Sequence, residues 1–218
     1  MIERSANGDR RQPRHLLVGQ MDGPVTILPT GRVAMAGARL HAGALYRLLP
    51  VPQQELAGRV HDLDTIWHGW TRRTADRIAS AATPAAALDT LECALEELML
   101  HATWEADARG LARAVQCLRL TSGAAPIEIL AQQIGLGRRQ FERRFLEYVG
   151  LSPRLFGRIV RFQRAFRALG AESGAAVAAR CGYADQAHLV REVRRFAGQT
   201  PTLLAQAEGL TAFFRAED

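Results

Sequence analysis

The stretch that decides the fold is residues 178–201, AARCGYADQAHLVREVRRFAGQTP. A small residue, Ala178, is followed four positions later by Gly182, which can adopt the positive φ of a tight turn after a helix. Asp185 is a good N-cap for a second helix, which ends at Gly198 before a Thr-Pro pair. The stretch therefore predicts a helix, a short turn and a second helix.

The same pattern occurs about 48 residues earlier in the chain. Residues 131–153, AQQIGLGRRQFERRFLEYVGLSP, place Ala131, Gly135, Gly150 and a Ser-Pro pair at the matching positions. The shift between the copies changes by one residue in the turn, where an insertion is tolerated. Gly137 takes the N-cap position and is a weaker cap than Asp. Internal repetition favours two copies of one structural unit, so we expect two helix-turn-helix units.

The second helix of each copy has an apolar face and an outward face. At 100° per residue, Phe141 and Phe145 lie opposite Arg139 and Arg143, and Arg191 matches Arg143 in the second copy. A helix in the major groove presents such a face to base edges, where arginine suits guanine and glutamine suits adenine. The pattern therefore favours DNA reading.

Residues 153–169 predict one long helix between the two copies, with apolar residues spaced along one side. At 1.5 Å per residue this helix would be about 25 Å long. That length suits a strut that places two recognition helices about one DNA turn, roughly 34 Å, apart.

On these motifs, residues 106–207 strongly resemble the DNA-binding domain of the AraC/XylS family of transcriptional regulators. The resemblance rests on five segments: 129–136, 141–145, 178–186, 188–191 and 198–201. It implies a mainly α fold, in which seven helices carry two helix-turn-helix units joined by a long helix. It also implies a sequence-specific DNA-binding transcription regulator that reads two successive major grooves in the cytoplasm.

The resemblance also places the residues that would contact bases. Transferred by position, they are Arg138, Arg139, Glu142, Arg143, Gln186, Ala187, Val190 and Arg191. Two residues depart from the family pattern. Gly137 stands where the family usually has Ser, and Val190 stands where a polar residue is common. The second departure leaves the second unit with fewer hydrogen-bond donors.

Composition divides the chain into three stretches. Residues 1–52 are rich in Gly and Pro and suggest two or three short strands, at 16–18, 25–28 and 33–40. Residues 53–104 suggest helices, namely a short one at 55–56, one over 62–81 and one that starts at Thr83-Pro84. Residues 105–210 form the expected DNA-binding domain. The N-terminal region is thus expected to be a small, incomplete α+β part.

Residues 33–99 also resemble the tail of the β-rich sensory domain that precedes the DNA-binding domain in a family subgroup. The resemblance implies that this chain begins inside that domain. A truncated gene, a late start codon or a reduced sensor would each explain this. Because a complete barrel needs about eight strands, we expect no enclosed effector pocket before residue 52. Whether a small-molecule effector exists stays open.

The distribution of charge agrees with a nucleic-acid partner. The chain has 218 residues and a net charge of +6, and all 28 of its basic residues are arginine. Residues 1–110 hold 12 arginines and 13 acidic residues, whereas residues 111–218 hold 16 and 9. The positive excess therefore lies in the second half, as in a DNA-binding domain joined to a neutral one. A basic surface kept for solubility is the alternative.

Other chemistry finds little support in the sequence. His61 and His68 have no further ligands at zinc spacing, and no phosphate-binding loop or nucleophile elbow occurs. Asp62 and Asp64 suggest a helix N-cap rather than an acid–base pair. We therefore expect no enzyme, metal or cofactor. Three cysteines and three tryptophans are expected to pack in the core: Cys93, Cys117, Cys181, Trp67, Trp70 and Trp104.

Two functions stay open at this point. The favoured one is the DNA-binding regulator, with double-stranded DNA as partner and with RNA polymerase and a second copy of the chain as further candidates. The alternative is an effector-binding or protein-interaction module whose helix-turn-helix pair no longer reads DNA. No apolar run reaches the roughly 18 residues of a membrane span, so we expect no membrane partner.

Overall fold

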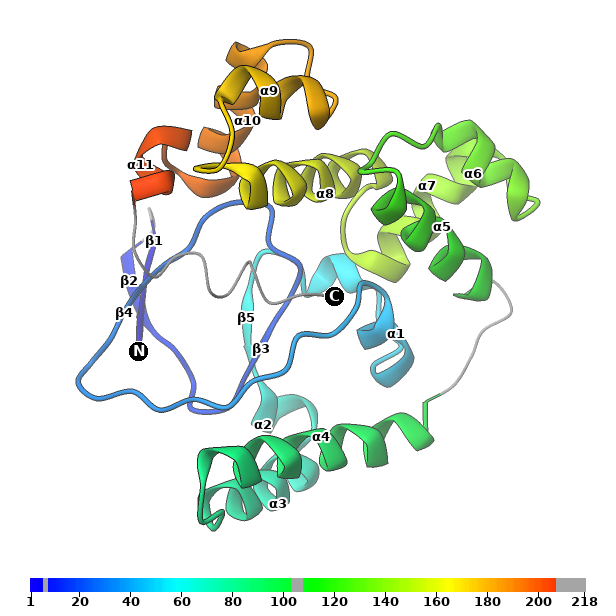
Figure 1. Cartoon of the computed structure of the whole chain (residues 1–218). Coiled ribbons are helices and arrows are strands. Elements are labelled where there is room, and N and C mark those ends of the chain that lie inside the picture. Colours follow the sequence, from blue (N-terminus) through cyan, green and yellow to red (C-terminus); the bar gives the residue numbers. More distant parts are fainter. Residues whose placement is uncertain (6–7, 103–107, 207–218) are drawn as a thin grey trace. The chain divides into compact units, whose positions relative to one another are not determined.

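The computed structural model describes residues 1–5, 8–102 and 108–206. Over these ranges the protein is mainly helical, as expected, with short strands confined to its first part (Figure 1).

The chain divides into two compact units, which are described separately below. The first contains most of residues 1–109, and the second contains most of the residues from Gly110 onward. The expected boundary between residues 104 and 105 lies outside the described residues, as does the expected end of the DNA-binding domain at residue 210.

Two small antiparallel sheets occur among the described residues of the first unit. One has the strand order β2–β1–β4, and the other pairs β3 with β5. The strands are β1 (Ile2–Ser5), β2 (Gly8–Arg11), β3 (Leu16–Val18), β4 (Thr26–Leu28) and β5 (Val60–Asp62).

The expected strands at residues 16–18 and 25–28 are confirmed, but the third, at 33–40, is wrong. This segment joins neither sheet, and the side chains of Val33 and Met35 are 48% and 69% exposed. An apolar run becomes a strand only where a neighbour satisfies its backbone groups. The polar sequences of β1 and β2, IERS and GDRR, gave no strand signal. Four strands therefore precede Pro52 in the described chain, rather than two or three.

The described helices of the first unit are α1 (Ala44–Leu48), the 3₁₀ turn η1 (Gln53–Glu55), α2 (Leu63–Ile66), α3 (His68–Ala79) and α4 (Pro84–Leu100). Two of them, α2 and α4, begin at the expected caps. The Asp62 carboxylate accepts a hydrogen bond from the Asp64 N–H at 3.0 Å. The Thr83 hydroxyl accepts one from the Ala86 N–H at 3.2 Å. Both N-cap predictions are thus confirmed.

The single helix expected over residues 62–81 is wrong, because Trp67 interrupts it with φ −132° and ψ 54°. The Trp67 ring instead meets Trp70 edge-on, with centroids 6.0 Å apart. The Trp70 indole N–H donates to the Ala94 carbonyl at 3.1 Å, which ties α3 to α4. These two tryptophans are half-buried, as packing residues are, and Trp104 lies outside the described residues.

The second unit is a chain of helices (Figure 1). They are α5 (Ala108–Leu120), α6 (Ile127–Gln133), α7 (Arg138–Val149), α8 (Pro153–Ala168), α9 (Gly174–Arg180), α10 (Gln186–Ala197) and α11 (Pro201–Gln206). Figure 1 shows α8 running from the group of α5, α6 and α7 to the group of α9, α10 and α11. The expected long helix and its capping Ser152, which accepts from the Leu155 N–H at 3.3 Å, are confirmed.

The two turns of the repeat have the same hydrogen bonds. Gly135 and Gly182 have φ values of +71° and +75°, as the sequence predicts. The next residue in each copy donates its N–H back to the small residue of the first helix. Leu136 reaches the Ala131 carbonyl at 3.0 Å, and Tyr183 reaches the Ala178 carbonyl at 2.9 Å. This left-handed C-terminal cap ends the first helix and sets where the second one starts.

Each copy buries the apolar face of its second helix. In the first, Phe141 and Phe145 are fully buried, and Phe145 also meets Phe156 of α8 at 5.8 Å. In the second, a core cluster gathers residues from α8, α9, α10 and α11, including the fully buried Leu189 and Val193. The predicted inward faces are therefore confirmed, and the opposite faces of α7 and α10 remain available.

The three cysteines differ in burial, so the expectation of a shared core role is wrong for one of them. Cys181 is buried in the second unit, Cys117 is half-buried, and Cys93 on α4 is exposed. Helix α4 leaves part of its apolar surface uncovered, as the 51% exposed Leu88 shows. An apolar neighbourhood in the sequence therefore does not bury Cys93.

The first prediction concerns the turn of the second copy. A Cβ at Gly182 would meet no atom within 4 Å, so substitution acts through backbone strain alone. We expect Gly182→Ala to lower the free energy of unfolding by about 1–2 kcal/mol. Gly182→Asn should lose less, because Asn tolerates the left-handed region better. Urea unfolding measures both, and an alanine variant as stable as the wild type would contradict the role of this turn.

Candidate nucleic-acid interface

Helix α7 presents the expected residues of the first helix-turn-helix copy to solvent. Arg138, Arg139 and Arg143 are exposed, and Glu142 is half-exposed. The core-facing Phe141 lies on the opposite side of the helix. The structure therefore gathers these four residues on the outer face of α7.

The arginines of this face differ in their partners. The Arg138 guanidinium donates to Glu142 at 3.1 Å and forms an ion pair with Glu128 of α6. The hydrogen bond with Glu142, together with both negative charges, raises the pKa of Arg138. Among the described residues, Arg139 and Arg143 have no ion-pair partner. Arg138 is thus held in place by carboxylates, whereas the other two can meet an external acceptor.

Helix α10 presents the expected residues of the second helix-turn-helix copy in the same way. Gln186, Ala187 and Arg191 are exposed, and Val190 is half-exposed. Gly174 of α9 leaves room for the Gln186 amide, since a Cβ there would lie 2.8 Å from Nε2. This role of Gly174 was missed in the sequence, where nothing connects the two positions.

The start of α10 is tightly held. The Asp185 carboxylate accepts from the His188 N–H at 2.6 Å, which confirms the predicted N-cap. The His188 ring meets Tyr183 edge-on at 5.2 Å, and its Nδ1 lies 3.4 Å from the Ala184 N–H. The sequence places His188 near phosphate or solvent, and the structure gives it a half-buried position against the turn.

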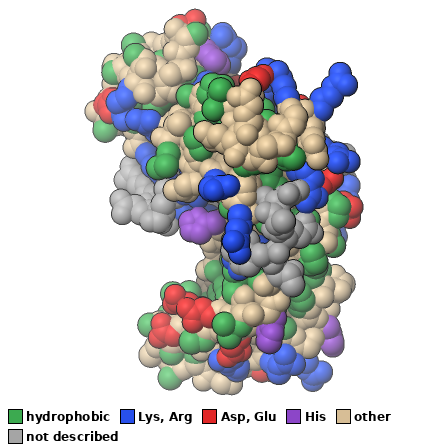
Figure 2. All heavy atoms as spheres, turned by 90° about the vertical axis from the view of Figure 1, so that its right-hand side faces the viewer, with side chains coloured by type: hydrophobic (Ala, Val, Ile, Leu, Met, Phe, Trp, Pro, Cys, Tyr) green, Lys and Arg blue, Asp and Glu red, His purple; other side chains and the backbone are tan. Residues whose placement is uncertain are grey.

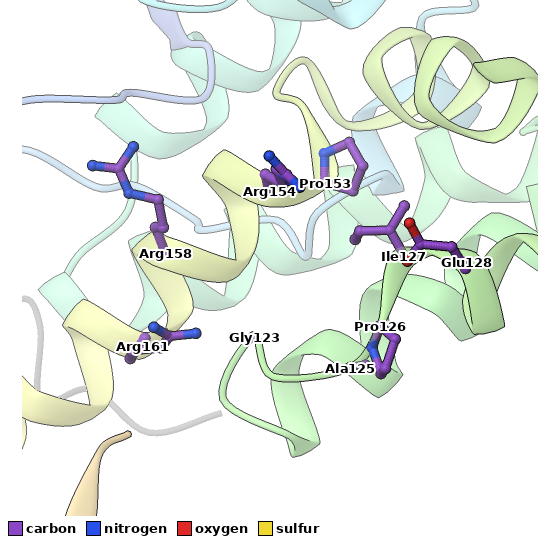
Figure 3. A pocket seen from close by; sticks show the side chains of 9 residues that line it. All are labelled: Gly123, Ala125, Pro126, Ile127, Glu128, Pro153, Arg154, Arg158 and Arg161. Atoms are coloured by element: carbon purple, nitrogen blue, oxygen red, sulfur yellow. The ribbon is translucent and has the colours of Figure 1, made fainter. Parts of the chain in front are cut away.

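A row of arginines on α8 lines an open groove in the second unit. Figure 3 shows Arg154, Arg158 and Arg161 projecting from the helix near the loop that contains Gly123. The groove has a volume of about 370 Å³. The helical pattern predicts α8 only as a strut, so this row is not among the expected site residues. The composition of this segment does indicate a basic helix, because residues 153–168 hold five arginines and no acidic residue.

One residue of this row is engaged by α10. The Arg158 guanidinium binds the Glu192 carboxylate through two hydrogen bonds, of 2.7 and 3.0 Å. Glu192 is only 8% exposed. No sequence pattern predicts this pair, because the partners are 34 positions apart and belong to different helices.

The charged side chains of the second unit are more often basic than acidic. On the face formed by α5, α6 and α7, arginine side chains are more prominent than acidic ones (Figure 2). This agrees with 16 arginines against 9 acidic residues in the second half of the sequence. In the part of the chain that the structure describes, no cluster of His, Cys, Asp and Glu could hold a metal ion. None of the described helices is both long and apolar enough to span a bilayer.

Comparisons with known proteins found a similar solved structure and a matching family model. A crystal structure of the DNA-binding domain of AdpA, the global transcriptional factor, in complex with a target DNA is 29% identical, with a TM-score of 0.42. The similarity covers 47% of this chain and 96% of that one. No curated protein matches the chain. The sequence model of a family described as "Helix-turn-helix domain" matches residues 130–207. Residues 130–207 are therefore similar to a helix-turn-helix domain, as the repeat predicts.

Proposed function

We propose that this protein is a sequence-specific DNA-binding transcription regulator that reads two successive major grooves with α7 and α10. The observation that carries the proposal is the repeated helix-turn-helix unit, with an outward basic face on each second helix. The family match over residues 130–207 supports the same function.

In the proposed complex, α7 and α10 enter the major groove and present their outer faces to base edges. Arg139, Arg143 and Arg191 would each donate two hydrogen bonds to guanine, and Gln186 would pair with adenine. Arg138 and Glu142, already bonded to each other, would act together at the start of α7. Ala187 and Val190 carry no donors, so they would offer only apolar contacts, for example to a thymine methyl.

Helix α8 would set the spacing between the two recognition helices. Its 16 residues give a length of about 24 Å at 1.5 Å per residue. With a recognition helix packed at each end, this length is compatible with roughly 34 Å, one turn of DNA. The basic excess of the second half would supply the sequence-independent attraction to phosphates.

Besides DNA, we propose RNA polymerase and a second copy of the chain as candidate partners. Whether a small-molecule effector exists stays open. The first unit offers short strands and amphipathic helices that could serve as a dimer contact. The described part of residues 1–52 contains four short strands, so we expect these residues by themselves not to enclose an effector pocket, for which a barrel uses about eight strands.

The alternative function is a module whose helix-turn-helix pair no longer reads DNA. The donor-poor face of α10, with Ala187 and Val190, is the observation that favours it. A gel shift on DNA from upstream of its own gene, at several salt concentrations, separates the two functions. A regulator forms a complex that resists competing random DNA, whereas the alternative gives no complex or one that random DNA removes equally well.

The second prediction concerns base reading by α7. We expect Arg143→Ala to weaken specific binding by about 1–3 kcal/mol and to relax selectivity at one base pair. Arg113→Ala is the matched control, because it removes the same charge from an exposed position on α5. Fluorescence anisotropy with specific and random duplexes measures both variants. An equal loss on both duplexes would mean that Arg143 touches phosphate only.

The third prediction concerns the two-unit architecture. We expect one chain to protect two segments on the same face of the DNA, centred about 10 base pairs apart. The protection opposite α10 should be the weaker, because Ala187 and Val190 offer no donors. Hydroxyl-radical footprinting measures this directly. Protection of a single groove segment per chain would refute the simultaneous use of both units.

A further inference from the structure

The second recognition helix shares an apolar core with α8 and is also bound to it by one guanidinium. Arg158 Nε lies 3.0 Å from Glu192 Oε2, and an Arg158 terminal nitrogen lies 2.7 Å from Glu192 Oε1. The same guanidinium carbon lies 5.5 Å from the centroid of the Phe196 ring. Glu192 and Phe196 are one helical turn apart on α10. Arg158 therefore contacts two successive turns of the recognition helix.

The position of Glu192 on α10 is unusual for a charged residue. It directly follows Arg191 of the outer face and precedes Val193 of the core, and it is 8% exposed. Burial of its carboxylate is unfavourable, but the hydrogen bonds from Arg158 outweigh burial and lower the pKa of Glu192. The carboxylate therefore stays ionised and bound to Arg158 at neutral pH.

A bidentate pair constrains direction more than it adds stability. Apolar contacts, such as those of Leu189 and Val193, depend on buried area and tolerate small rotations of a helix. A planar guanidinium and a carboxylate require two parallel hydrogen bonds, which fix their relative orientation. The pair is only partly buried, because the Arg158 side chain is 39% exposed and that of Glu192 is 11% exposed. Replacing even a buried ion pair by well-packed apolar residues is often neutral for stability. The distinctive effect of this pair is therefore geometric.

We infer that Arg158 and Glu192 are positioning residues that fix the rotation of α10 about its axis, and so aim Gln186 and Arg191 at the bases. The inference rests on the proposed function, since it concerns how α10 reads DNA. With side chains about 6 Å from the helix axis, a rotation of about 20° displaces them by about 2 Å. Such a displacement breaks hydrogen bonds to base edges, which need donor–acceptor distances of about 3 Å.

The first helix-turn-helix copy has a different arrangement. Arg144 stands at the place of Glu192 in the repeat, so no equivalent carboxylate exists there. Instead, Glu128 and Glu142 hold Arg138 on the outer face itself. The pair of Arg158 with Glu192 is thus specific to the second helix-turn-helix copy. Few base-reading donors are available there, so their orientation matters most.

The structure also provides a matched control pair. Arg180 of α9 binds Glu172 through two hydrogen bonds of 2.7 and 3.1 Å, which is the same geometry. Neither partner belongs to α8 or α10. Glu172→Gln therefore removes a similar ion pair without changing the aim of a recognition helix.

The test compares specific and random duplexes by fluorescence anisotropy, with the full chain. We expect Glu192→Gln and Arg158→Lys to weaken specific binding at least tenfold, and to leave binding to random DNA within about twofold of the wild type. Base preference should disappear in the half-site read by α10 and persist in the half-site read by α7. Glu172→Gln should change neither.

A second variant separates the orientation of α10 from the stability of the protein. The apolar double variant Arg158→Met with Glu192→Leu should keep the wild-type melting temperature within a few degrees and still lose the base preference of α10. If either this variant or Glu192→Gln discriminates bases as the wild type does, the inference is overturned. If the wild type itself shows no preference for specific DNA, the proposed function fails instead, so the two failures are distinguishable.

Discussion

The rest of the DNA-binding unit depends on one hydrogen bond made twice. In each copy, a glycine with positive φ turns the chain, and the next N–H returns to a buried alanine carbonyl. Ala131 and Ala178 are 1% and 2% exposed, so the second helix packs closely against the first at these points. This fixes where α7 and α10 begin. Every later feature, from the buried aromatic face to the exposed arginines, follows from that starting point.

Helix direction and helix rotation are fixed by different interactions. The turn and its glycine set the direction in which α10 leaves α9, and Asp185 holds its first turn. Apolar packing then buries one side of the helix without specifying its rotation closely. The two hydrogen bonds between Arg158 and Glu192 add a directional contact further along. In α7, the aromatic contacts among Phe141, Phe145 and Phe156 occupy the core side, and carboxylates restrain Arg138 on the other.

The sequence predicts the second unit well, because its signals are local and repeated. The turn glycines, the Asp185 and Ser152 caps and the long helix over 153–168 are each encoded within a few residues. The sequence predicts the first unit less well. Its polar strands β1 and β2 depend on pairing, and the apolar segment 33–40 forms no strand because it joins neither sheet. At the break in the expected helix, the Trp67 ring packs against Trp70, a contact that the helical spacing did not predict. Glu192 was missed because its partner is distant in sequence.

The central claim is that two copies of one unit read DNA together at a fixed spacing. Selection of binding sites by the full chain from a pool of random duplexes tests this most directly. Two recognition helices joined by one rigid helix predict selected sites with two conserved blocks, centred about 10 base pairs apart. The better-defined block should be the one that α7 contacts. Selected sites with no consensus, or with a single block of the length that one helix covers, would contradict the account.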